Sequence, residues 1–179
     1  MFLDNNLAKK VSVLEVGFGT GLNFLLTADF CTVNKIELNY TGIEAYPLTD
    51  ELMSSTGYDQ YVTTGTRESL IKNYQSALTA PTVLNPYSNL QIAGCELMNF
   101  RSEEKFNVIY FDAFAAAHQP EMWNEEAIAH TVSFLKSGGV FVTYAITGNL
   151  KRMLKGLGLQ IQKIPGAAGK REMLRAVKI

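Results

Sequence analysis

The residues best suited to bind a ligand stand just after the first apolar run of this 179-residue chain. That run, residues 11–16, contains the acidic side chain Glu15, and glycines follow at every second position from Gly17 to Gly21. Glycine lets the backbone turn sharply and approach a ligand closely. Where a helix follows such a turn, its first backbone amides attract a negatively charged group. The pattern therefore predicts a ligand-binding turn with an acidic residue, Glu15, two positions before its first glycine.

Acidic side chains also stand at the ends of three later apolar runs. Glu44 closes the second run, where a carboxylate can accept hydrogen bonds from both hydroxyls of a ribose. Glu96 follows the third run beside Cys95, which has no neighbouring histidine to activate it as a nucleophile. Asp112 follows the fourth run. We expect these acids to face the same ligand as the glycine turn.

The segment after Asp112 carries aromatic side chains that could contact a nucleic-acid base. Phe114 lies two residues beyond the expected end of a strand and can stack on a base. Trp123 could do the same, although a single tryptophan is more typical of a core. We interpret His118 as a surface residue of this loop. The pattern favours Phe114 over Trp123 as a ligand contact.

Short apolar strands alternate with helices along the chain, and these elements must position the acids and glycines. We predict helices over 22–30, 47–55, 66–79, 120–135 and 149–157, and a turn-rich connection over 81–89. We predict strands over 11–16, 40–44, 90–93, 106–111, 140–144, 159–164 and 173–179.

This alternation is typical of an α/β fold with a doubly wound, mostly parallel sheet, here of seven strands. The last two strands are too close in sequence for a crossover helix, so we expect an antiparallel hairpin that adds one antiparallel strand at the sheet edge. Ligands of such sheets bind at the carboxyl ends of the strands. The glycine turn and the acids all fall there.

The composition indicates one globular domain over residues 1–179. Hydrophobic residues make up 47% and charged residues 18% of the chain, and no apolar run is long enough to span a membrane. The first ten residues lack the pattern of a secretory signal, so we expect a cytoplasmic protein. Two cysteines without CxxC spacing and two separated histidines argue against a metal site.

Charge is unevenly distributed along the chain. Residues 1–150 hold 8 basic and 16 acidic side chains, whereas residues 151–179 hold 8 basic side chains and one acidic side chain. The net charges are therefore −8 and +7, in agreement with −1 for the whole chain. A basic end on an acidic body indicates either an anionic partner at one edge or a solvated, lysine-rich surface.

The spacing of the glycines separates two kinds of nucleotide-binding turn. A dinucleotide fingerprint requires its third glycine at position 22, which is Leu22 here. An acid followed by glycines at 17, 19 and 21 instead resembles motif I of class I S-adenosyl-L-methionine (SAM) methyltransferases. The alternatives are a dinucleotide-binding oxidoreductase domain, a methyltransferase for a small molecule or protein, and a SAM-binding module without activity.

Four motifs, at 16–25, 44–48, 112–123 and 169–174, occur in an order typical of one family. Together they resemble the methyltransferase domain of MnmC, the tRNA 5-methylaminomethyl-2-thiouridine biosynthesis family. The resemblance runs from about residue 11 to the end of the chain. Its most specific parts are the Met-Trp pair at 122–123 and the Lys-Arg-Glu-Met-Leu run at 170–174.

This resemblance implies a SAM-dependent tRNA methyltransferase that acts on the aminomethyl group of the wobble uridine in the anticodon loop. Bifunctional members carry a following FAD-dependent oxidase domain, so the resemblance predicts a methyltransferase-only form without FAD, whose oxidase partner would be a separate protein. The chain departs from the family in its short start before the glycines. It also has Cys95 and Glu96 where members carry Asp, and Ala116 where they carry Pro.

The predicted site residues follow from the motifs and the resemblance. Asp112 is expected to be catalytic, orienting the substrate amine and accepting its proton. The residues expected to bind the cofactor are Glu15, Gly17, Phe18, Gly19, Gly21, Asn23, Glu44, Ala45, Cys95, Glu96 and Asp112. Those expected to bind the substrate are Phe114, Trp123, Lys170 and Arg171.

Overall fold

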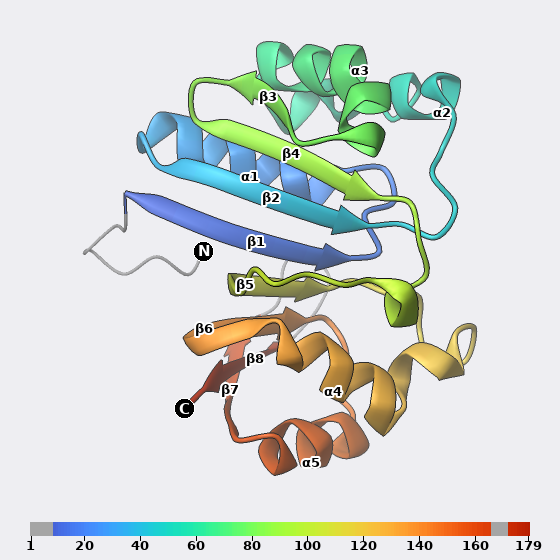
Figure 1. Ribbon diagram of the computed structural model, residues 1–179, viewed down its shortest axis with the longest axis vertical. Helices are drawn as coiled ribbons and strands as arrows, with labels where there is room; N and C mark the ends of the chain where they lie inside the picture. The colour runs from blue at the N-terminus through green and yellow to red at the C-terminus, as the bar shows by residue number, and fades with distance from the viewer. Residues whose placement is uncertain (1–8, 166–171) are drawn as a thin grey trace.

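The computed structural model describes residues 9–165 and 172–179 (Figure 1). Its strands are Lys10–Val16 (β1), Glu37–Ile43 (β2), Thr82–Asn85 (β3), Ser88–Ala93 (β4), Phe106–Phe111 (β5), Leu135–Thr143 (β6), Leu159–Pro165 (β7) and Glu172–Lys178 (β8). They form one sheet in the order β3-β4-β2-β1-β5-β6-β8-β7. The central strands from β4 to β6 run parallel, whereas β3 and β8 are antiparallel to their neighbours.

The α-helices of the described part are Leu22–Val33 (α1), Asp50–Ser54 (α2), Thr64–Thr79 (α3), Glu125–Ser133 (α4) and Gly148–Gly156 (α5). Side chains cap the first turns of three of them, and Thr49 does so at the start of α2. Asn124 accepts a hydrogen bond from the Ala127 amide at the start of α4, and Thr147 accepts one from the Leu150 amide at the start of α5. No helix in the described ranges is long and apolar enough to cross a membrane.

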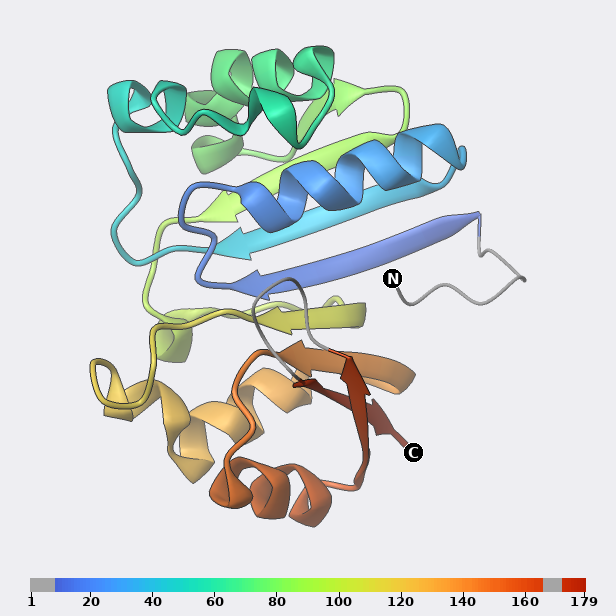
Figure 2. The ribbon, with the colours of Figure 1, turned by 180° about the vertical axis from the view of Figure 1, so that it is seen from behind.

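Helices cover both faces of the sheet, as the front and back views show (Figures 1 and 2). The helices α1 and α3 pack on one face over β2 and β4, and α4 and α5 pack on the other face over β6 and β7. Side chains of β1 alternate between the two cores, with Val11 and Val13 in the first and Leu14 and Val16 in the second. This two-sided cover confirms the predicted doubly wound fold.

The sheet has eight strands, and the prediction of seven was wrong by one edge strand. The additional strand β3 lies in the stretch 81–89, where we expected only a turn-rich connection, and the turn itself is confined to residues 86 and 87. The strand pairs with β4 alone, and its Val83 is 69% exposed. An edge strand without a buried face leaves no apolar pattern in the sequence.

The end of the sheet also differs from the expectation in its strand order. The closing hairpin of β7 and β8 is antiparallel, as predicted. However, β8 lies inside the sheet between β6 and β7, so the edge strand is β7. The predicted helix over 120–135 divides into a 3-10 helix, Pro120–Trp123, and α4, because Asn124 caps a new helix start. The strand β6 then begins at Leu135 and continues through a register shift against β5.

Candidate active site at the carboxyl edge of the sheet

The turn between β1 and α1 has a backbone conformation that glycine adopts most readily. Gly17, Gly19 and Gly21 have positive φ angles of 85°, 52° and 78°. A Cβ atom on Gly17 would lie 2.8 Å from the backbone oxygen of Asp112, so the turn passes directly against the end of β5. A Cβ atom on Gly19 would meet nothing within 4 Å. The outer side of the turn is therefore open to a ligand.

Backbone hydrogen bonds fix this turn to the neighbouring strand ends. The amides of Gly17 and Phe18 donate to the oxygen of Ile43 at 3.0 and 3.1 Å, and the amide of Asp112 donates to the last residue of β1 at 2.9 Å. The ring of Phe18 is buried against β2, where a Cβ atom on Gly42 would lie 2.5 Å from it. If Phe18 contacts a cofactor, it therefore does so through its backbone.

Glu44 extends from the end of β2 across the glycine turn. One carboxylate oxygen accepts from the Gly19 amide at 2.9 Å, and the other accepts from the Tyr46 amide at 3.1 Å. This arrangement places carboxylate oxygens beside the turn, where they can accept hydrogen bonds from ribose hydroxyls. The neighbouring Ala45 is exposed. Tyr46, which the motifs did not single out, is 78% exposed at the same edge.

Glu15 lies inside the sheet on β1 and is almost completely buried. Its Oε1 accepts from Asn23 Nδ2 at 2.7 Å, and its Oε2 accepts from the Tyr40 hydroxyl at 2.8 Å. Burial raises the pKa of Glu15 to about 8, with smaller raising contributions from the charges of Asp112 and Glu44, while the two hydrogen bonds oppose the rise. At neutral pH this carboxyl group therefore holds a proton.

Asp112 follows β5 and is exposed beside the glycine turn. Its Oδ2 accepts from Asn23 Nδ2 at 2.9 Å, so the first turn of α1 holds this carboxylate. Tyr144, which the sequence did not indicate, lies near it after β6. Burial raises the pKa of Tyr144, and the charge of Asp112 raises it further. The carboxylate thus stands at the surface where a substrate could reach it.

The loop after Asp112 separates the roles of its two aromatic residues. Phe114 is 73% exposed, and its backbone amide donates to the side-chain oxygen of Gln119 at 3.1 Å. Trp123 donates from its ring nitrogen to the Phe114 carbonyl at 2.8 Å, and its ring packs edge-on against Phe111 at 5.0 Å between centroids. Trp123 therefore anchors the loop, while the ring of Phe114 faces solvent.

Cys95 and Glu96 follow β4 further along the same edge. Cys95 is half-buried, and burial raises the pKa of its thiol. Its amide donates to the same carbonyl that accepts from the Glu44 amide, so Cys95 lies next to the end of β2. Glu96 is exposed and precedes the 3-10 helix Leu97–Asn99. Lys170 and Arg171 lie outside the described residues.

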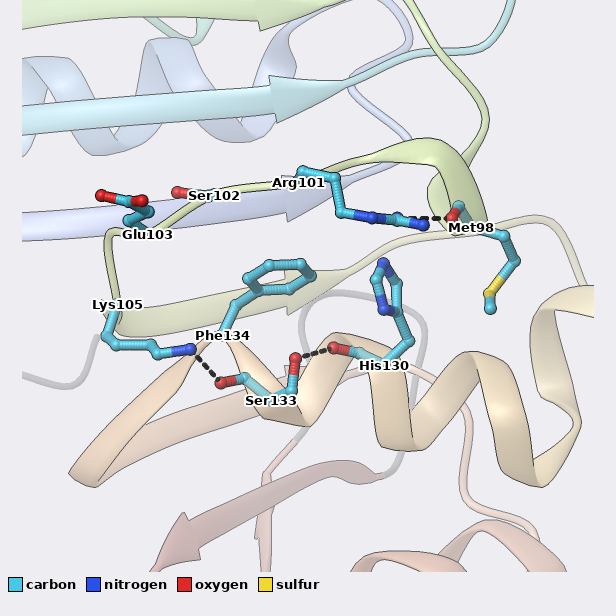
Figure 3. Close-up of a pocket in the computed structure, with 8 residues that line it drawn as sticks. All are labelled: Met98, Arg101, Ser102, Glu103, Lys105, His130, Ser133 and Phe134. Carbon is cyan, nitrogen blue, oxygen red and sulfur yellow. Dashed lines mark hydrogen bonds between the residues drawn. The ribbon is translucent and has the colours of Figure 1, made fainter.

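A separate hollow lies between α4 and the stretch that leads into β5 (Figure 3). Arg101 and Lys105 line it from that stretch, and His130 and Phe134 line it from the helix side. Both cationic side chains donate to backbone carbonyls, at 2.6 to 3.0 Å. None of the predicted site residues that the structure describes lines this hollow, so it is distinct from the site at the glycine turn.

Known proteins resemble this chain in sequence. The family model described as S-adenosyl-L-methionine-dependent methyltransferase matches residues 63–179. The tRNA 5-methylaminomethyl-2-thiouridine biosynthesis bifunctional protein MnmC of Leptospira borgpetersenii serovar Hardjo-bovis (strain JB197) is 26% identical over 183 residues, which cover 96% of this chain and 27% of that protein. The chain thus spans about a quarter of the length of the curated relatives it matches.

Solved structures share the fold. MNMC2 from Aquifex aeolicus matches with a TM-score of 0.73 and 19% identity, covering 95% of this chain and 54% of that chain. The N-methyltransferase NodS from Bradyrhizobium japonicum WM9, in complex with S-adenosyl-L-homocysteine, matches with a TM-score of 0.52 and 16% identity, covering 93% of this chain and 76% of that chain.

The site has groups that could bind SAM. Glu44 offers acceptors for ribose hydroxyls, and the amino end of α1, which has no side-chain cap, offers backbone donors for the methionine carboxylate. The family match over more than half of the chain overturns the oxidoreductase alternative. The chain belongs to the S-adenosyl-L-methionine-dependent methyltransferase family and is related to the methyltransferase part of MnmC.

Proposed function

We propose that this chain transfers the methyl group of SAM to the aminomethyl nitrogen of the wobble uridine, position 34, of tRNA. The product is 5-methylaminomethyluridine or its 2-thio form. The observation that carries the chemistry is the exposed carboxylate of Asp112, held by Asn23 directly beside the glycine turn. The substrate is supported by the relatives named as tRNA 5-methylaminomethyl-2-thiouridine biosynthesis proteins.

Methyl transfer to an amine requires a nitrogen that has lost its proton, whereas an alkyl ammonium has a pKa near 10.4. Bound SAM supplies the electrophilic methyl group. Asp112 uses Oδ2 to accept from Asn23, and Oδ1 of this exposed side chain can accept from the substrate amine. Because a carboxylate also stabilises an ammonium, Asp112 contributes mainly by orienting the nitrogen and by receiving the proton that leaves it.

The proposed substrate contacts among the described residues follow the carboxyl ends of β5 and β6. A base of the anticodon loop is single-stranded and can turn out of its stack. The exposed ring of Phe114 can stack on that base. Lys170 and Arg171, together with Lys151 and Arg152 at the start of α5, would contact the phosphates. The affinity for tRNA is then expected to fall steeply with rising salt.

The experiment that tests this function uses tRNA with an unmethylated aminomethyl uridine at the wobble position. The protein is incubated with this tRNA and SAM, and the digested nucleosides are weighed by mass spectrometry. A gain of one methyl group on that uridine supports the proposal, and reactions without SAM or with tRNA that already carries the methyl group serve as controls. No gain from protein that binds SAM by calorimetry would exclude this substrate.

The variant Asp112→Asn tests the assigned catalytic residue. It keeps the side-chain shape but lacks a group that can receive a proton, so turnover is expected to fall by about 100-fold or more. Binding of SAM is expected to persist, since the backbone of the glycine turn is unchanged. Glu121→Gln, an exposed change in the 3-10 helix after this loop, is the matched control. Turnover of Asp112→Asn close to wild type would remove Asp112 from the mechanism.

A further inference from the structure

One side-chain amide joins the buried and the exposed carboxyl groups of the site. Asn23 Nδ2 donates to Glu15 Oε1 at 2.7 Å and to Asp112 Oδ2 at 2.9 Å. An amide nitrogen has two protons that diverge in one plane. When both protons are donated, the orientation of the Asn23 amide plane is fixed. The orientation of the Asp112 carboxylate, which accepts one of these protons on Oδ2, is then fixed as well.

Glu15 is placed to act on Asn23 and on nothing outside the protein. Its side chain is 1% exposed, and its two oxygens are bound to Asn23 and Tyr40. It therefore cannot contact a substrate in this arrangement. Tyr40 is itself buried, and its ring packs edge-on against Phe24 of α1 at 5.1 Å between centroids. This packing gives Glu15 a rigid support behind the exposed residues.

We propose that Glu15 is a positioning residue for methyl transfer, which holds the Asn23 amide and through it the carboxylate of Asp112. This inference rests on the proposed function, because it takes Asp112 as the group that meets the substrate amine. It assigns Glu15 a role other than direct contact with the cofactor.

The charges around Glu15 are consistent with this role. The ionisable groups that face it are Asp112, Glu44, Tyr40 and Tyr110. Because the pKa of Glu15 is raised to about 8, the buried carboxyl is neutral at pH 7, and it places no second negative charge behind Asp112. A neutral carboxyl still accepts the Asn23 proton on its carbonyl oxygen, so positioning does not require its ionisation.

The test is a double-mutant cycle on Glu15 and Asn23, measured as kcat at saturating SAM and tRNA. Glu15→Leu and Asn23→Ala are each expected to lower kcat by on the order of 10- to 100-fold, the value of a hydrogen bond to a charged group. The double variant is expected to lose little more than Asn23→Ala alone, because both changes release the same carboxylate. Losses that multiply would show that Glu15 acts independently of Asn23 and would overturn the proposal.

Two further variants separate positioning from folding. Glu15→Gln keeps an oxygen that accepts from Asn23, so it is expected to restore at least half of the loss in kcat, on a logarithmic scale, that Glu15→Leu causes. Glu51→Gln, exposed on α2, is the control for a surface change. The Kd for SAM of both Glu15 variants is expected to stay within about threefold of wild type. A weakened Kd with an unchanged kcat would identify Glu15 as a cofactor ligand instead.

Crystal structures of Glu15→Gln and Asn23→Ala give a readout that does not depend on the substrate. In Glu15→Gln the bond from Asn23 to Asp112 is expected to remain near 2.9 Å, and in Asn23→Ala the Asp112 carboxylate is expected to leave its position. An unmoved carboxylate in Asn23→Ala would overturn the positioning role. Absence of methyl transfer by wild type would refute the proposed function alone, because the carboxylate position is observed separately.

Discussion

Replacement of Glu15 by Gln is expected to stabilise the protein progressively as the pH rises. The buried carboxyl has a pKa of about 8 in the folded protein, raised by burial from an ordinary value of 4.5. Between these pH values the folded state retains a proton that the unfolded chain releases, so the free energy of unfolding of the wild type falls as the pH rises. Below pH 4.5 this loss is absent, and above pH 8 it is complete. Gln cannot ionise and removes the effect.

The size of the effect follows from the two pKa values. At about 1.36 kcal/mol per pH unit, the interval from 4.5 to 8 corresponds to roughly 5 kcal/mol, of which about 3 kcal/mol is present at pH 7. The stability of a domain is about 5–15 kcal/mol. Glu15 alone would therefore account for a large part of any loss of stability between pH 5 and pH 9. Tyrosines and cysteines with raised pKa values are present in both proteins and cancel in the difference.

Urea unfolding followed by circular dichroism, without SAM, at one-unit steps from pH 5 to pH 9 measures this difference. The gap in free energy of unfolding between Glu15→Gln and wild type is expected to widen by about 4 kcal/mol over this range. Glu51→Gln, an exposed change of the same type, is expected to run parallel to wild type. A gap that is constant with pH would refute the reasoning, because it would show that Glu15 titrates alike in the folded and unfolded chains.

Two further predictions concern the glycine turn and Lys178 at the end of β8. Gly17→Ala places a Cβ atom 2.8 Å from the Asp112 oxygen at a φ of 85°, so we expect a loss of about 1–3 kcal/mol in urea unfolding and a weaker Kd for SAM by calorimetry. Gly19→Ala, in open space, is expected to lose less stability. Lys178 Nζ donates to the carbonyl of Val132 in the last turn of α4 at 3.1 Å and to that of Leu135 at 2.9 Å. Lys178→Met is therefore expected to lose about 1–2 kcal/mol, whereas the exposed Lys72→Met is expected to lose almost none.

The parts of the fold that the sequence predicts are those with a local signal. The strands β1, β5 and β6 contain nearly continuous apolar stretches because helices cover both faces of the sheet. The glycine spacing at 17–21 indicates a turn whose residues have positive φ angles, which glycine adopts readily. The strand β3 carries no such signal, because it has one neighbour and an exposed Val83.

The connections within the site depend on pairing between distant strands. The parallel register places Glu15 of β1 opposite Gly42 of β2, and Tyr40 lies two residues earlier on β2. Its hydroxyl reaches Glu15 from 25 positions away in the sequence. An acid within an apolar run is a visible signal of an unusual environment. Tyr40, which donates a hydrogen bond to this acid, can be identified only once the register of β1 and β2 is known.

Phe18 shows why a motif alone does not place a side chain. The glycine spacing marks residues 17–21 as a ligand turn, and Phe18 lies in its centre. Its ring nevertheless turns inward, because Gly42 leaves space on β2 for it. The amides of Gly17 and Phe18 then donate to the Ile43 carbonyl. The outer side of Gly19 remains open, and we propose that the cofactor binds there and at the start of α1. The shape of the turn thus depends on glycine at position 42, because a Cβ atom there would meet the Phe18 ring. A larger residue at position 42 would displace the turn without contacting the ligand.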